Sequence, residues 1–66
     1  MDIYITRDED TELRLWRGKA RKTDQGFWIR DGEKHLLSLG KDLNLYPMVS
    51  WNDAESKRVI SLNIEE

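Results

Sequence analysis

Apolar residues recur mainly at every second position, the spacing of β-strands, in which neighbouring side chains point to opposite faces. Ile3 and Ile5 alternate with polar neighbours, which predicts a first strand over residues 2–7. Leu13 and Leu15 repeat the pattern after a short acidic turn, and the two segments together predict a hairpin. The alternating Ile and Leu side chains of both strands are expected to face the core.

Turn signals divide the middle of the chain into two further short strands. Residues 23–26 (Thr-Asp-Gln-Gly) are typical of a tight turn, because glycine tolerates positive φ and aspartate can cap its own backbone. Residues 27–29 are the predicted third strand. The Asp-Gly pair at residues 31–32 is a strong hairpin signal, and it places the fourth strand at residues 35–39.

The second half of the chain begins with an irregular segment at residues 41–47. Pro47 cannot donate to a ladder, and it restricts the residue before it to extended geometry. Leu43 and Leu45 are expected to pin this segment across an open end of the core. A fifth strand is predicted at residues 48–51.

The last strand is predicted at residues 57–64, where the alternation is the most regular in the chain. Its apolar face carries Ile60, Leu62 and Ile64. An alternative for residues 53–58 is a short helical turn, because an aspartate at the first position can cap a helix. The alternation that follows favours the strand over a longer helix.

Short strands separated by tight turns predict a mainly β protein, with residues 1–66 forming a single small domain. Below about 70 residues, bending an antiparallel sheet into a small barrel covers both its core and its edges. An SH3-like barrel of five to six strands is therefore the predicted architecture. The alternative is an open meander that dimerises through its uncovered face, and Tyr46, Met48 and Trp51 would supply an apolar patch for self-association.

Composition argues against most kinds of chemistry. The chain has no cysteine and one histidine, His35, so thiol catalysis, disulfides and a structural zinc site are not expected. Its glycines are scattered singly, which does not fit a phosphate-binding loop. We predict no catalytic residue, no metal and no cofactor, and therefore a protein that is not an enzyme. No apolar run is long enough to span a membrane, and the missing cysteines fit the reducing cytoplasm.

The net charge of −2 hides a basic stretch, because residues 13–22 contain five basic residues and no acid. If the leucines of the second strand point inward, the tryptophan and arginine between them point outward. The tryptophan of the third strand is expected to share its face with the arginine that follows it. The candidate binding face therefore comprises Arg14, Trp16, Arg17, Arg21, Trp28 and Arg30.

Three interpretations of this face stay open. Exposed tryptophan among arginines is typical of single-stranded nucleic-acid binders, in which rings stack on bases and cations follow phosphates. The same residue types are enriched at the hot spots of protein interfaces. In the third interpretation the indoles belong to the structure itself, and arginine stems cover them by cation–π contact.

Three fragments, taken in order, resemble short bacterial and prophage-encoded β-domain proteins that have no established activity. They are residues 3–8 (Ile-Tyr-Ile-Thr-Arg-Asp), residues 26–28 (Gly-Phe-Trp) and residues 45–51 (Leu-Tyr-Pro-Met-Val-Ser-Trp). Met48 stands where that pattern has an acid. The resemblance spans most of the chain and implies a compact β-domain from a prophage or other mobile element, with no catalytic residue to carry over.

Taken together, these observations predict a non-enzymatic protein-interaction module that binds an unidentified protein partner. Binding would use the tryptophan and arginine face, or the addition of a strand at a sheet edge. The alternatives are a small single-stranded nucleic-acid-binding domain and a structural homodimer.

Overall fold

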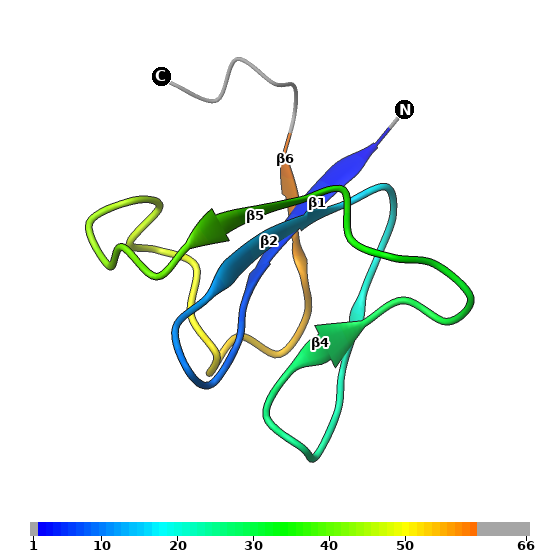
Figure 1. The fold of residues 1–66 in the computed structure, drawn as a ribbon, viewed down its shortest axis with the longest axis horizontal. Helices are drawn as coiled ribbons and strands as arrows, with labels where there is room; N and C mark the ends of the chain where they lie inside the picture. The colour runs from blue at the N-terminus through cyan, green and yellow to red at the C-terminus, as the bar shows by residue number, and fades with distance from the viewer. Residues whose placement is uncertain (1, 60–66) are drawn as a thin grey trace.

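The computed structural model describes residues 2–59, and these residues form six strands and no helix (Figure 1). The strands are β1 (Ile3–Arg7), β2 (Leu13–Trp16), β3 (Arg21–Lys22), β4 (Trp28–Ile29), β5 (Leu37–Gly40) and β6 (Lys57–Val59). Accordingly, this part of the chain contains no helix of the length and apolar character that a membrane span requires. The predicted mainly β class is confirmed.

Four of the strands form an antiparallel sheet in the order β5-β2-β1-β6, and β3 pairs with β4 in a separate two-stranded sheet. The predicted hairpin of β1 and β2 is confirmed, with Tyr4 opposite Trp16 and Arg7 opposite Leu13. Among the described residues, β5 and β6 each pair on one side only and form the two edges of the larger sheet.

One face of the β1–β2 hairpin carries the first hydrophobic cluster. Its buried members are Ile3, Ile5, Leu13, Val49 and Val59. Both isoleucines lie on alternate positions of β1, and Leu13 is fully buried on the neighbouring strand. The period-two pattern therefore assigned these side chains to the core correctly.

The opposite face of the same hairpin carries a second cluster. Trp16, Ala20 and Trp28 are buried there, and Tyr4 and Trp51 pack against them. The β3–β4 hairpin supplies Trp28, which means that this hairpin covers the second face. The prediction that Trp16 and Trp28 are exposed is wrong. Both side chains point away from the first cluster, as expected, but they are buried in the second cluster rather than exposed to solvent.

Several predicted elements differ from the observed ones. The segment predicted as a fifth strand at residues 48–51 forms turns, in which the Val49 amide donates to the carbonyl of Tyr46. Residues 53–56 form bends and irregular backbone before β6, so the alternative helix at residues 53–58 does not form. The last strand is confirmed over Lys57–Val59, and the rest of the prediction at residues 57–64 lies outside the described residues.

Two smaller differences concern the middle of the chain. The predicted third strand at residues 27–29 is two residues long as β4, and the predicted fourth strand at residues 35–39 corresponds to β5, which begins and ends later. No pattern in the sequence predicts β3, because Arg21–Lys22 contains no apolar position to mark a strand.

Candidate functional site

The six residues of the predicted binding face do not share one surface. Trp16 and Trp28 have exposed fractions of 3% and 1%, and both indole N–H groups have internal partners. Trp16 Nε1 donates to the Thr6 hydroxyl at 2.9 Å, and Trp28 Nε1 donates to the Arg7 carbonyl at 3.0 Å. Both tryptophans are therefore part of the structural core.

Three of the four predicted cations are held in ion pairs with carboxylates. The pairs are Arg14 with Asp8 at 3.0 Å, Arg21 with Asp31 at 3.1 Å, and Arg30 with Glu33. Arg17 is the exception, since its side chain is exposed and forms no ion pair within residues 2–59. A binding face assembled from all six predicted residues is therefore not present.

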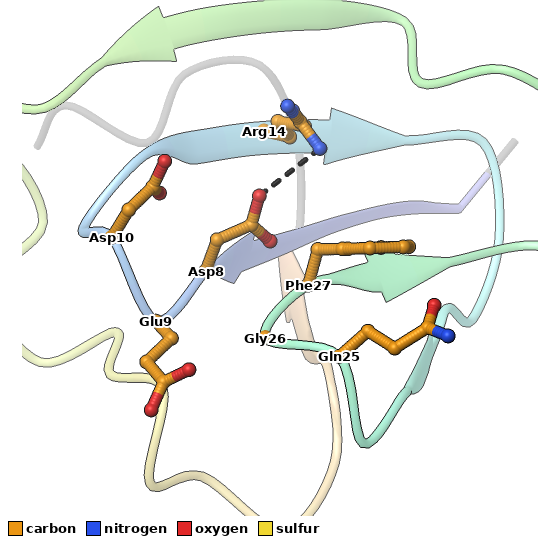
Figure 2. A pocket seen from close by; sticks show the side chains of 7 residues that line it. All are labelled: Asp8, Glu9, Asp10, Arg14, Gln25, Gly26 and Phe27. Atoms are coloured by element: carbon orange, nitrogen blue, oxygen red, sulfur yellow. Dashed lines mark ion pairs between the residues drawn. The ribbon is translucent and has the colours of Figure 1, made fainter.

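A hollow of about 370 Å³ lies where the turn between β1 and β2 meets the turn between β3 and β4 (Figure 2). Its lining residues are Asp8, Glu9, Asp10, Arg14, Gln25, Gly26 and Phe27. Two of its three carboxylates are already paired with cations, Asp8 with Arg14 and Asp10 with Lys41 at 3.4 Å. The charge of the hollow is therefore largely neutralised by cations of β2 and of the segment after β5, while the two hairpins are joined by a hydrogen bond from the Glu9 amide to the Gly26 carbonyl.

Asp8 is the buried acid among the residues that line this hollow. Its Oδ1 accepts a hydrogen bond from the Trp28 backbone amide at 3.1 Å, and its Oδ2 pairs with Arg14. Burial raises the pKa of Asp8 above the ordinary value of 3.8, although the Trp28 amide and Arg14 act in the opposite direction. By contrast, the backbone amide of Glu12 lowers the pKa of the exposed Asp10.

The raised pKa of Asp8 gives a prediction for stability against pH. The folded protein binds a proton at Asp8 more readily than the unfolded chain, so the resulting stabilisation is complete below the unfolded pKa and is lost as pH rises through the folded pKa. Compared with the non-titrating variant Asp8→Asn, the wild type is expected to lose free energy of unfolding between about pH 3 and about pH 7. Urea titrations of both proteins at these pH values measure the difference. If the wild type instead gained stability relative to Asp8→Asn as the pH rises, the pKa of Asp8 would not be raised in the folded protein.

Arg7 is the buried cation that holds the long segment after β5. Its side chain is 96% buried, since only 4% of the residue is exposed, and its guanidinium donates to backbone carbonyls. The acceptors are Val49 at 2.8 Å, Thr11 at 2.8 Å, Leu45 at 2.6 Å, Tyr46 at 3.3 Å and Asp42 at 3.4 Å. The sequence offered one signal, because Arg7 continues the inward positions of Ile3 and Ile5.

The segment at residues 41–47 is therefore attached to the core differently from the prediction. Leu43 and Leu45, which were expected to pin it, have exposed fractions of 60% and 37%. The carbonyls of this segment point at Arg7, which leaves its leucine side chains at the surface. Met48 is also exposed, whereas Tyr46 packs against the first cluster and Trp51 against the second, so these three do not form one exposed patch. Self-association stays a prediction.

The most unusual surface of the described residues is the β5 edge, which we define as β5 together with the preceding Leu36. Leu36 and Leu37 are exposed by 42% and 53%, and β5 pairs with β2 alone. Natural sheets protect their edges with charged residues, especially lysine. The other edge of this sheet follows that rule, since Lys57 and Arg58 lie on β6, whereas no residue of β5 is charged.

β5 is nevertheless fixed firmly to the sheet. The Leu36 amide donates to the carbonyl of Leu15 at 2.7 Å, and the Ser38 hydroxyl donates to the Glu12 carboxylate at 2.5 Å. The hydrogen bond from that hydroxyl lowers the pKa of Glu12. The outer side of β5 is therefore an ordered, uncharged strand whose main-chain groups have no partner strand among residues 2–59.

Comparison with protein-family models, with curated proteins and with solved structures gives no match to this chain. The resemblance to prophage-encoded β-domain proteins therefore stays a prediction.

Proposed function

We propose that this domain is a non-enzymatic protein-interaction module that binds an extended segment of a partner protein along the β5 edge. The observation that carries the proposal is the combination of an edge position, exposed leucines and missing charge on one strand. In strand addition, main-chain hydrogen bonds supply affinity and alternate side chains supply selectivity. The exposed Leu37 offers the apolar contact for such a side chain.

Two features of the β5 edge support this mode of binding. The hydrogen bonds from Leu36 and Ser38 hold the strand in place before any partner arrives, which reduces the entropy lost on binding. Six large hydrophobic residues are exposed within residues 2–59, and five of them lie between residues 36 and 48, within β5 and its flanking segments. A partner strand lying on β5 has apolar contacts available at both ends.

The open form of the sheet is part of the proposal. A closed SH3-like barrel, the architecture favoured by the sequence, would pair β5 with β6 and occupy the same edge. The nucleic-acid alternative receives less support, because the two indoles expected to stack on bases are buried.

A random peptide library displayed on phage tests the proposal. Peptides that bind are expected to be extended and to weaken by about tenfold on the variant Leu37→Ser, because serine removes the apolar contact that Leu37 offers to the bound segment. Phe27→Ser is the matched control, since it makes the same kind of change at another exposed apolar residue, outside the β5 edge. Fluorescence polarisation of a labelled peptide measures both affinities. Equal losses in the two variants would show that binding does not use β5.

A further inference from the structure

We infer that the segment bound along the β5 edge is acidic, an inference that rests on the proposed function and specifies the partner's chemistry. The cations that flank the start of β5 carry this inference. Among them, Arg17 and Lys34 are exposed, and neither forms an ion pair with any residue between 2 and 59.

The fold brings these two cations to the same end of the sheet, although they are far apart in the sequence. Arg17 follows Trp16, whose ring lies 6.0 Å from the ring of His35 in an edge-to-face contact. Lys34 directly precedes His35 in the sequence, so each of the two cations is next to one of the two rings in contact. The next residue, Leu36, is hydrogen-bonded to Leu15, so the contact lies directly at the start of the β5 edge.

Two acids close to Lys34 in the sequence, both within the described part of the chain, are already paired with cations. Glu33 pairs with Arg30, and Asp31 pairs with Arg21. The guanidinium of Arg30 also lies against the backbone of Gly18, where a β-carbon would come within 2.8 Å of it, but Glu33 balances its charge. The excess therefore rests on Arg17 and Lys34. Consequently the start of the β5 edge has an excess of positive charge next to exposed leucines.

An acidic segment complements this surface in two ways. Carboxylates on the partner would pair with Arg17 and Lys34, and the long-range attraction would speed association at low salt. Apolar side chains of the same segment would contact the exposed leucines. Phosphates would also be attracted, but stacking platforms for bases are not available, since Trp16 and Trp28 lie in the core. The geometry therefore favours an acidic peptide over a nucleic acid.

The experiment uses peptides selected from the random library on the full chain. Acidic residues are expected to be enriched among them, and replacing those acids by the corresponding amides should weaken binding by about tenfold at low salt. The double variant Arg17→Gln/Lys34→Gln should cause a similar loss. Lys57→Gln/Arg58→Gln is the matched control, because it also removes one exposed lysine and one exposed arginine, from β6 at the opposite edge of the sheet.

Each outcome decides one of the two proposals. Selected peptides without acidic enrichment, bound equally by both double variants, would overturn the acidic partner and leave strand addition at β5 intact. A library that yields no binder would overturn the proposed function itself. A labelled single-stranded oligonucleotide that binds more tightly than every selected peptide would overturn the acidic peptide in favour of a nucleic acid.

Discussion

Replacing Arg7 by methionine is expected to lower the free energy of unfolding by about 3–5 kcal/mol, which is most of the stability of a domain of this size. The guanidinium is buried and donates to five carbonyls, so its loss leaves acceptors such as Val49 and Leu45 without a donor. Each buried acceptor left alone costs about 1–3 kcal/mol. Chemical denaturation, followed by tryptophan fluorescence, measures the loss.

The direction of this effect is not obvious, because removing a buried charge also removes the cost of burying it. Buried ion pairs are often replaced by apolar residues without loss when both partners are exchanged. Here the acceptors are main-chain carbonyls, which no side-chain substitution can exchange, so the penalty remains. Arg17→Met is the control, since it makes the same change at an exposed position. A stability of Arg7→Met within about 0.5 kcal/mol of that control would mean that these bonds contribute little.

Side-chain alternation was sufficient to predict the parts of the fold that depend on local pattern. It placed β1 and β2, paired them in a hairpin, and turned Ile3, Ile5 and Leu13 inward. These predictions succeed because the pleat of a strand fixes which residues share a face. The same rule could not say whether the other face meets water or a second layer of structure.

This ambiguity explains the error at the two tryptophans. Tyr4 and Trp16 are cross-strand neighbours on the second face, and a residue distant in sequence, Trp28, covers them. The sequence contained a hint, because a hairpin with aliphatic residues on one face and Tyr4 and Trp16 on the other has more apolar surface than one core needs. The candidate site was missed for a related reason, since exposure of Leu37 depends on which strands pair beyond β5 and not on its own neighbours.

The failed strand at residues 48–51 has a different cause. Its apolar residues fit a strand, but the carbonyls of Tyr46 and Val49 accept hydrogen bonds from Arg7, a residue more than thirty positions earlier. A charged side chain that replaces a partner strand leaves no periodic trace in the sequence. The periodicity of apolar residues therefore predicts strands better than it predicts loops whose backbone is held by a buried polar side chain.

Replacing Trp28 by alanine is expected to reduce the free energy of unfolding by about 3–5 kcal/mol, the usual cost of truncating a buried aromatic residue. Trp28 joins the two sheets, because its ring packs edge-to-face on Trp51 at 6.3 Å and its indole N–H donates to the Arg7 carbonyl. Lys22 adds a cation over both rings, 5.4 Å from Trp28 and 4.7 Å from Trp51. Loss of the indole therefore uncovers the second face of the β1–β2 hairpin.

Two companion variants separate the contributions of Trp28. Trp28→Phe keeps an aromatic ring but removes the donor to Arg7, and a loss of about 1–3 kcal/mol is expected from the unsatisfied carbonyl and the smaller volume. Phe27→Ala, at the neighbouring residue, should cost less, since Phe27 is 36% exposed and Trp28 only 1%. Thermal and urea unfolding of the three variants measure these losses. If Trp28→Ala unfolded at the same urea concentration as Phe27→Ala, the indole would not hold the two sheets together. An exposed tryptophan face would then again be the better interpretation of the sequence.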